Sequence, residues 1–452
     1  MHSTPAQDGF KREIFVESDS SLSHFGGLPS AVCFLKRNGL IPSILKRLSD
    51  KLPRLYRREH SVQFSPEDLL MQRFIALLAG CEDLNDVDLL REDKGYIAAV
   101  GKRRLASTAT LCRFEKSMTQ EVIDEGNRLL LEAYFRYSGN SRYIYLDVDN
   151  TPVELYGHQE GVKFNGHYGC NCYLPLLVFI NGFPVGVFNG TMDGRETLQK
   201  HLGRLIDRIQ EKRPRSVIVL RADSGFNCQS LIDLCEQHGI YYLIGLGPNS
   251  KLVSVLRDQD KEFLETLQCL PISPSGMLRY YGEINDYVAK TWRGPRRIIA
   301  RDHYSAERKE WDPRFIQTNI PRTKDGRCGR LWEFDAKELY EKLYCARGTD
   351  EQYNQEFKAQ AFGARASSMF FLTNSWRMLL GALCQLAFKI LRTCYFRKKS
   401  PWHTSTLRRF RETFIRIPAQ IKEFKTRVKV LISCPRETLA AVSGFLSAKP
   451  TQ

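Results

Sequence analysis

One segment in the last third of the chain carries four polar side chains at spacings suited to phosphate chemistry. Tyr344, Arg347, Glu351 and Lys358 stand at relative positions 0, 3, 7 and 14. At about 100° per residue of an α-helix they fall within one arc of about 60°. That face would present one acid of a metal site among groups that hold a nucleic-acid backbone. The alternative is an ordinary solvated helix. Glu356, about 140° from Glu351 on such a helix, is expected to lie off this face.

Other acids stand where two expected strands end. Residues 142–151 form a β-rich run containing Asp147 and Asp149, which point to one sheet face because they are two positions apart. Residues 217–226 form a second strand that ends in Asp223, followed by a Ser-Gly turn. A carboxylate just past a buried strand is costly unless it is paired or binds a cation. Strand-end aspartates are also common as caps and turn residues.

Three carboxylates from two strands and one helix could together hold two Mg²⁺ ions, which are hard cations that prefer oxygen ligands. Two such ions, about 3.5–4 Å apart, activate an attacking oxygen and stabilise the leaving oxygen in phosphoryl transfer. The predicted site therefore consists of acids from both strands and from the Glu351 helix.

Together these blocks resemble bacterial insertion-sequence transposases of the DDE type, in the branch with the Tyr-(2)-Arg-(3)-Glu-(6)-Lys signature. The four polar residues of the helix match that signature with its full spacing, and residues 221–226 resemble the block around the second aspartate. Residues 146–151 resemble the first block, where the catalytic aspartate precedes a small residue and Thr or Ser; this favours Asp149 over Asp147. The resemblance covers about residues 60–395. Three more segments resemble one subgroup of these transposases: Gly157–Gly161, Phe164–Tyr168 and Cys172–Leu176.

The resemblance implies that Asp149, Asp223 and Glu351 are the catalytic residues and bind two Mg²⁺ ions, for which Mn²⁺ can substitute. It also implies DNA contacts beside the scissile bond from the other three signature residues, Tyr344, Arg347 and Lys358. The expected partners are the terminal repeats of the element and target DNA, with a homodimer in a synaptic complex. Neither a membrane nor a small-molecule substrate is expected.

The order of the predicted elements favours an α/β fold with a ribonuclease-H-like catalytic core, a mixed five-stranded sheet with helices. The elements are strands at 142–150, 168–180 and 183–190, a helix at 194–212, a strand at 217–222, a helix at 227–238 and a strand at 240–246. In this fold the first and fourth strands are neighbours, which would bring Asp149 and Asp223 to about one strand spacing of 4.8 Å. The predicted regions are 1–135, 136–250, 251–335, 336–396 and 397–452.

The first region is predicted to be mainly helical, after a short strand at Glu13–Glu17. Ser65 and Pro66 are a good helix start, with Ser as cap and Pro at the first position. Residues 107–115 resemble the entry of a helix in a small DNA-binding unit, such as a helix-turn-helix reader. A bundle that only supports dimer contacts is an equal alternative.

The third region, 251–335, is predicted to be a β-rich insertion within the core, because the segment between Asp223 and Glu351 is too long for one strand, one helix and a loop. It places an aromatic residue beside arginines that could stack a displaced base while holding phosphates. Packing of the aromatic ring across strands is the alternative. The candidate DNA-binding residues are Trp292, Arg293, Arg296 and Arg297.

The last region, 397–452, is predicted to be a basic C-terminal tail. Residues 388–430 contain 13 Lys or Arg against 2 Glu, which concentrates the positive charge of the chain there. A phosphate-binding surface is the interpretation and a solvated tail the alternative. Its candidate DNA-binding residues are Arg397, Lys398 and Lys399.

Composition agrees with this function. At 452 residues two or more domains are expected, and a formal charge of +16 fits a polyanionic partner, although ribosomal or membrane-surface proteins share that balance. No run of 18 apolar residues occurs, the first residues do not resemble a signal peptide, and 13 cysteines without a framework suit the cytoplasm. The sequence predicts a DNA transposase; the alternatives are a metal-dependent nuclease without strand transfer and a catalytically silent DNA-binding descendant.

Overall fold

The computed structural model describes residues 21–55, 64–190, 201–259, 261, 277–290, 292–305 and 310–447. The predicted strand Glu13–Glu17 and the first part of the predicted helix 194–212 lie outside these residues.

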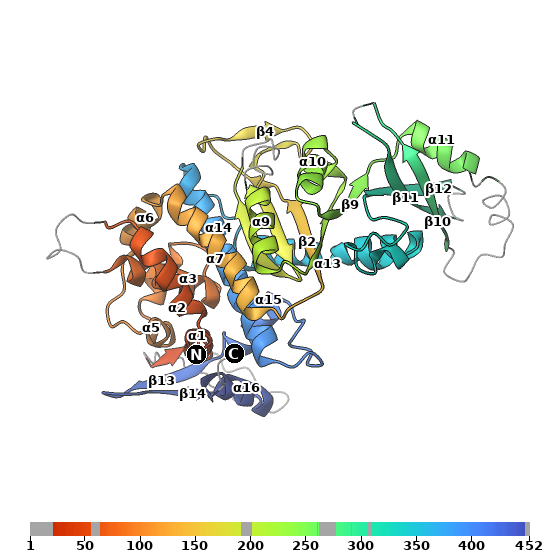
Figure 1. The fold of residues 1–452 in the computed structure, drawn as a ribbon. Helices are drawn as coiled ribbons and strands as arrows, with labels where there is room; N and C mark the ends of the chain where they lie inside the picture. The colour runs from red at the N-terminus through yellow and green to blue at the C-terminus, as the bar shows by residue number, and fades with distance from the viewer. Residues whose placement is uncertain are drawn as a thin grey trace, which may run out of the picture.

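A mixed sheet of eight strands runs through the middle of the molecule, in the order β10-β11-β12-β9-β8-β2-β6-β7 (Figure 1). Five of these strands form its central part: β2 (Tyr143–Asn150), β6 (Leu176–Ile180), β7 (Phe183–Phe188), β8 (Val217–Ala222) and β9 (Tyr241–Leu246). β2, β8 and β9 are parallel, and β6 is antiparallel to both of its neighbours. The first and fourth strands of this group, β2 and β8, are neighbours, as predicted. The arrangement is consistent with a ribonuclease-H-like core.

The remaining three strands extend this sheet instead of forming a separate one. β12 (Glu310–Thr318) pairs antiparallel with β9, β11 (Arg296–Ser305) pairs with β12, and β10 (Met277–Tyr287) forms the edge. The helix α11 (Ser250–Gln259) packs beside β10. The inserted strands are thus hydrogen-bonded directly to the catalytic half of the sheet, on the side opposite the N-terminal helices (Figure 1).

Helices cover the other end of the molecule. In the N-terminal region these are α1 (Leu28–Arg37), α2 (Leu40–Leu48), α3 (Pro66–Ala79), α4 (Asp86–Leu90), α5 (Lys94–Val100), α6 (Thr108–Lys116) and α7 (Gln120–Tyr137). Ser65 caps α3 in a capping box with Asp68, as its Ser-Pro start suggests. α9 (Gly203–Lys212) and α10 (Gln229–Gln237) flank the central strands.

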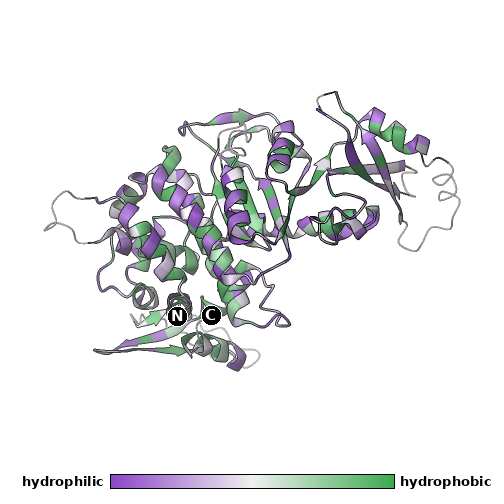
Figure 2. Cartoon of the chain, viewed as in Figure 1, coloured by the Kyte–Doolittle hydropathy of each residue, from purple (hydrophilic) through white to green (hydrophobic). Residues whose placement is uncertain are grey.

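A long apolar helix, α14 (Phe371–Ile390), lies against α7, α3 and β7. Its segment from Phe371 to Tyr395 is long and apolar enough to cross a membrane by length and composition, but 78% of the apolar window is buried within the protein. Figure 2 shows apolar residues gathered on this helix and on the central strands, with hydrophilic residues on the outer helix faces. α14 is therefore packed as a core helix.

Residues 397–447 are folded, in contrast to the predicted basic tail. They form α15 (Leu407–Phe414), the strands β13 (Ala419–Glu423) and β14 (Val428–Ile432), and α16 (Arg436–Ser447). β13 pairs with β1 (Leu22–Ser23) near the N-terminus, and α16 packs on α1. The prediction failed here because charge dominates the composition, whereas burial of Phe410, Phe414 and Phe445 decides the structure.

Candidate active site

The two strand-end aspartates come together at one edge of the sheet. Val148 and Ala222 are register partners of the parallel strands β2 and β8, so Asp149 and Asp223 follow them side by side. Asp223 also accepts a hydrogen bond from the amide of Gly225 at 2.9 Å, which fixes the turn after β8. The negative charge of Asp223 reaches Asp149 and contributes to raising the pKa of its carboxyl group.

Asp149 is held by three groups. Its Oδ1 accepts the Asn150 amide at 2.9 Å, its Oδ2 accepts the Asn354 side-chain amide, and Arg347 Nη1 lies 3.9 Å from Oδ2. Burial raises the pKa of Asp149 to about 6, opposed by the nearby Arg347 charge and assisted by Asp223. A half-buried carboxylate beside a second carboxylate is an environment that a cation would stabilise.

Asp147 has a different role from Asp149, although both lie on β2. Arg221 donates through Nε and Nη2 to the two oxygens of Asp147, at 2.5 and 2.7 Å. Its Nη1 donates to the carbonyl oxygen of Leu343 at 2.7 Å. Both partners of the ion pair are almost fully buried. The preference for Asp149 in the first block is thus compatible with the geometry, since the carboxylate of Asp147 is already bound within the protein.

The signature segment is not one regular α-helix, so the predicted arc of 60° does not describe it. It consists of a π-helix at Glu338–Tyr344, a 3₁₀ turn at Cys345–Arg347, α13 at Gly348–Gln355 and a second π-helix at Glu356–Gln360. Each change of helix type rotates the following residues away from the 100° rule. Uniform α-helical periodicity was the wrong assumption.

Two of the four signature residues still lie at the aspartates. A Cβ atom added at Gly245 would lie 2.8 Å from the Tyr344 hydroxyl and 3.0 Å from the backbone carbonyl carbon of Asp223, so only glycine admits this ring. The Arg347 guanidinium lies over the Tyr344 ring, 5.9 Å from its centroid. Arg347 and Tyr344 thus occupy the edge of the sheet beside Asp149 and Asp223.

Glu351 and Lys358 are not brought to the same point. Glu351 is exposed and Lys358 is half-buried. Among the described residues no group of three His, Cys, Asp or Glu side chains is placed to hold a metal ion. Asp149 and Asp223 fit a shared divalent cation, because they supply two adjacent oxygen-bearing groups in a partly buried place. A third carboxylate does not join them in this conformation.

Two residues near the aspartates were not predicted. Asn354, which is 9% exposed, donates to Asp149, and its own buried side-chain oxygen has no hydrogen-bond partner among the described residues. Tyr168 lies near both carboxylates. Burial is the main cause that raises the pKa of its hydroxyl group, and the charges of the two carboxylates raise it further. Asn354 could not be identified as a site residue from the sequence, because it is not one of the four signature residues. Tyr168 belongs to the segment Phe164–Tyr168, which was noted only because it resembles one subgroup of these transposases.

The helix that carries Glu351 is anchored to α14. Gln385 donates to the carbonyl oxygen of Tyr353 at 2.9 Å, and the Tyr353 ring fills the space over Gly182, where a Cβ would lie 2.4 Å from ring carbon Cζ. The Lys389 ammonium lies 5.7 Å from the same ring, and burial lowers the pKa of Lys389 to about 8. These contacts fix α13 directly after Glu351.

Glu356 lies off the aspartate side, as predicted, but it is fully buried. It forms an ion pair with Arg392 at 2.9 and 3.1 Å and accepts the Leu407 amide at 3.0 Å, at the start of α15. Glu356 therefore joins the signature segment to α14 and α15.

The arginines predicted in the insertion are mostly engaged within the protein. Arg296 is buried, donates to Gln317 and Gln229, and stacks on Trp292 at 4.2 Å. Trp292 also contacts the Tyr287 ring, which agrees with the packing alternative. The remaining pairs join Arg297 to Glu283 at 2.6 Å and the exposed Arg293 to Asp233 at 3.3 Å. Only Arg293 of these four side chains is largely open to solvent.

The C-terminal candidates are exposed. Arg397, Lys398 and Lys399 form a surface turn, closed by a hydrogen bond from the Ser400 amide to the Arg397 carbonyl oxygen at 2.8 Å. No ion pair involving them is found among the described residues. Their ammonium and guanidinium groups are free to meet phosphates.

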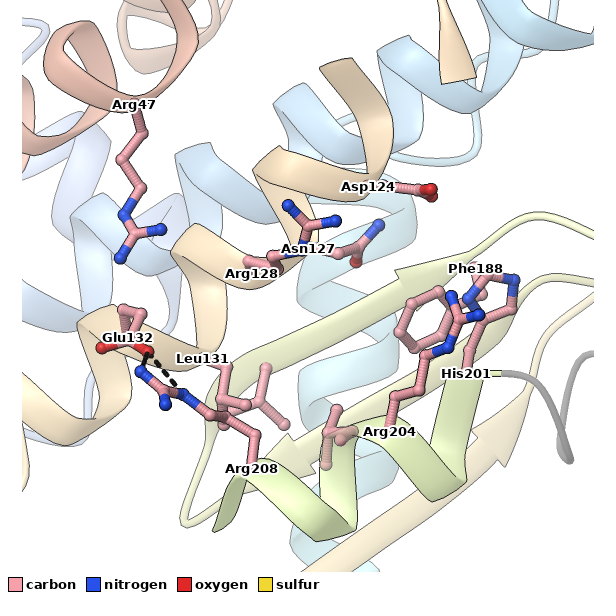
Figure 3. A pocket seen from close by; sticks show the side chains of 12 residues that line it. Arg47, Asp124, Asn127, Arg128, Leu131, Glu132, Phe188, His201, Arg204 and Arg208 are labelled. Atoms are coloured by element: carbon pink, nitrogen blue, oxygen red, sulfur yellow. Dashed lines mark hydrogen bonds and ion pairs between the residues drawn. The ribbon is translucent and has the colours of Figure 1, made fainter. Parts of the chain in front are cut away.

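A separate cavity of about 330 Å³ lies between α7, α9 and β7 (Figure 3). The His201 ring stacks on Phe188 with centroids 4.5 Å apart, and Arg208 reaches across to Glu132. None of the predicted site residues lines this cavity. It is distinct from the aspartate pair.

In comparisons with known proteins, the profile of one family, described as Transposase DDE domain group 1, matches residues 39–442. No curated protein matches the chain. The matched range covers the aspartates, the signature segment and most of the helical and C-terminal regions.

Proposed function

Because the chain belongs to the family of transposases with a group 1 DDE domain, we propose that it binds the ends of an insertion sequence, cleaves them and transfers the strands to target DNA. The family implies transposition of DNA, and thus a DNA phosphoryl-transfer enzyme. The observation that most supports this proposal is the Asp149–Asp223 pair, held at adjoining strand ends beside Arg347. The signature spacing from Tyr344 to Lys358 supports assignment to the branch named for it.

Transposases of this kind typically use divalent metal ions. We assign Asp149, Asp223 and Glu351 as the residues that hold two Mg²⁺ ions, with Mn²⁺ as a substitute. When bound, these ions would lower the pKa of the attacking water or 3′-hydroxyl and neutralise charge on the departing oxygen. Asn354 supports this assignment, because its amide donates to Oδ2 of Asp149 and so fixes the direction of the carboxylate.

The cationic residues of the segment hold the DNA. Arg347, next to Asp149, offers two parallel N–H groups to the phosphate at the cut, and the Tyr344 hydroxyl donates from the side of Asp223. Lys358 contacts the backbone farther along. These groups stabilise charge that develops on the phosphoryl oxygens in the transition state. No covalent protein–DNA intermediate is required.

Joining two ends requires both to be held together, so we propose a homodimer in the synaptic complex, acting in the cytoplasm. Arg397, Lys398 and Lys399, together with Arg293, are proposed contacts for the flanking duplex. The predicted contacts of Trp292, Arg296 and Arg297 would require them to leave their present partners.

A second candidate is a DNA-binding protein that does not cleave. The exposure of Glu351, and the lack of a third carboxylate placed with the two aspartates among the described residues, favour it. Our proposal instead requires DNA and metal to draw Glu351 toward them. The two differ in whether the purified protein cuts an element end.

The test uses a labelled duplex carrying the element end, incubated with the protein in Mg²⁺, Mn²⁺ or EDTA, and sized on a denaturing gel. We expect cleavage at the element boundary with either metal, none in EDTA, and a joined product when plasmid target is added. Cleavage without joining would indicate a nuclease. Binding without cleavage in either metal would support the silent alternative.

A further inference from the structure

A β-hairpin projects from the C-terminal region, away from the helical body (Figure 1). β13 and β14 pair antiparallel, and a hydrogen bond from the Phe424 amide to the Arg427 carbonyl oxygen at 2.8 Å closes the tip. All eight residues from 422 to 429 are exposed. Four of them are basic and one is acidic: Lys422, Lys425, Arg427, Lys429 and Glu423.

The charges on this hairpin do not stabilise its fold. Lys422 and Lys429 are direct cross-strand partners, and like charges in that relation destabilise a sheet. The neighbouring strand β1 covers only Ala419 and Gln420 of β13, leaving the projecting end without a third strand among the described residues. A two-stranded ribbon alone is marginally stable in water. Binding of a polyanion would neutralise these charges and so remove the repulsion between Lys422 and Lys429.

The tip also carries an exposed aromatic ring. Phe424 is 49% exposed, and the Arg427 guanidinium lies over its ring at 4.9 Å from the centroid. None of the four basic side chains forms an ion pair in the part of the chain that the structure describes. The hairpin therefore presents unpaired cations and an apolar contact together.

The dimensions of the hairpin suit one groove of duplex DNA. Two strands about 4.8 Å apart form a narrow ribbon. The major groove of B-DNA is about 12 Å wide and admits a two-stranded ribbon, whereas the minor groove is about 6 Å wide. We propose that the β13–β14 hairpin is a DNA-binding element that enters the major groove, with Lys422, Lys425, Arg427 and Lys429 on the flanking phosphates. This inference rests on the proposed function for its partner.

A second copy of this chain is the competing occupant, because β14 is an edge strand. Lysines along an edge oppose pairing with another strand, since the joined sheet would bring their charges together. Val428 and Leu431 are exposed beside them and would give that alternative an apolar contact. The charge pattern favours DNA.

The test measures the salt dependence of binding for two fluorescent 30-bp duplexes, one with the element end and one scrambled. Binding of each additional phosphate steepens the slope of log K against log salt by about 0.9. The double variants Lys422→Gln/Lys429→Gln and Lys425→Gln/Arg427→Gln should each flatten the slope by about 1.8 on both duplexes, because phosphate contacts carry no sequence information. The matched control Lys36→Gln/Lys212→Gln, two exposed lysines on α1 and α9, should leave it unchanged.

Folding of the variants is checked by thermal unfolding. The midpoint of Lys422→Gln/Lys429→Gln should equal or slightly exceed that of the wild type, because a like-charge pair is removed. A photo-crosslinker placed at residue 424 should label the duplex. Point variants are preferable to deletion of residues 400–452, which would remove α15 and α16 from the fold.

An unchanged slope with no cross-link to DNA would overturn the proposal. A shift in molar mass by light scattering, with an unchanged slope, would assign the hairpin to a second copy. An equal effect of the control pair would show a general loss of charge and also overturn it. Failure of the proposed function is seen separately, as absence of metal-dependent cleavage by the wild type, because the slope can be measured without cleavage.

Discussion

Arg221 donates to both carboxylate oxygens of Asp147 in a buried ion pair that joins β2 and β8, the two strands that end at Asp149 and Asp223. The same guanidinium donates to the carbonyl oxygen of Leu343, directly before Tyr344. This residue thus joins β2, β8 and the signature segment. Asp147, the acid closest to Asp149 in the sequence, therefore supports the site through its ion pair with Arg221.

Replacement of Asp147 by Asn should act through stability. It leaves Arg221 buried with one strong partner fewer, which should lower the free energy of unfolding by about 3 kcal/mol. We expect cleavage to be reduced but present at temperatures where the variant is folded. Urea unfolding and single-turnover cleavage on the same preparation check this. A stable variant that is fully inactive would instead place Asp147 in the catalytic set.

Removing any one of the three acids should abolish cleavage while preserving DNA binding. Asp149→Asn, Asp223→Asn and Glu351→Gln each remove the charge of a proposed metal ligand at constant size. Gel-based cleavage with binding by anisotropy measures both. The control is Glu338→Gln, which removes a partly exposed ion pair with Lys342 and keeps an oxygen that can accept the Asp335 amide. Wild-type cleavage by Glu351→Gln would exclude this residue from the site.

The raised pKa of Asp149 predicts a stability change with pH. Its value of about 6 in the folded protein, above the ordinary 3.8, means that the folded state binds more protons between these values. The free energy of unfolding from this group is therefore greatest at low pH and falls as pH rises through that interval. Without divalent metal, Asp149→Asn should stabilise the protein at pH 7.5 by about 1–3 kcal/mol.

Chemical unfolding in EDTA at pH 7.5 and pH 4 tests this prediction. The gain should shrink to a small fraction at pH 4, because there the wild-type carboxyl group is protonated in the folded state and about half protonated in the unfolded state. A gain that is the same at both values would show that burial of the charge is not its cause.

Arg347 should matter more than Lys358. Arg347 lies beside Asp149 and can grip phosphate at two points, whereas Lys358 is farther along the segment. We expect Arg347→Ala to slow single-turnover cleavage by a factor on the order of 10² and Lys358→Ala by about tenfold. Arg347→Lys should restore only part of the rate. Equal losses for the two alanine variants would contradict this order.

Glu356→Gln should be destabilising, although Glu356 lies off the aspartate side. The expectation from helical periodicity alone would be tolerance, but the carboxylate pairs with Arg392 and receives the Leu407 amide. Loss of its charge should cost about 3 kcal/mol of unfolding free energy. Thermal melts measure the loss. Arg392→Gln should be equally harmful, and the double variant less harmful than the sum.

The sequence was informative where one physical rule acts alone. β-rich runs that end in acids placed β2 and β8 correctly, with β8 matching the predicted residues 217–222. The partners of buried charged residues could not be predicted in the same way. The resemblance of residues 146–151 favoured Asp149, but the ion pair of Asp147 could not be predicted, because Arg221 reaches Asp147 only after two distant strands pair. The π-helix at Glu356–Gln360, after Glu351, likewise packs against α14.

The C-terminal region was misjudged for a related reason. Its lysines and arginines suggested a tail, while the aromatic residues of α15 and α16 that bury it against the first helices are few. Asn354 shows the same limit at the site, since an amide becomes informative only once its donor is seen on Asp149.

The pairing of β1 with β13 also bears on how the chain is made. Gln420 donates to Ser21 at 3.1 Å across 399 positions of sequence, and the amides of Gly26 and Gly27 bond to the carbonyl oxygens of Ile417 and Ile415. A ribosome adds about 5–20 residues per second, so the first strand waits on the order of 20–80 seconds for its partner. A chain that stops before β13 lacks these contacts, so the N-terminal end of the fold is completed only after β13 has been made.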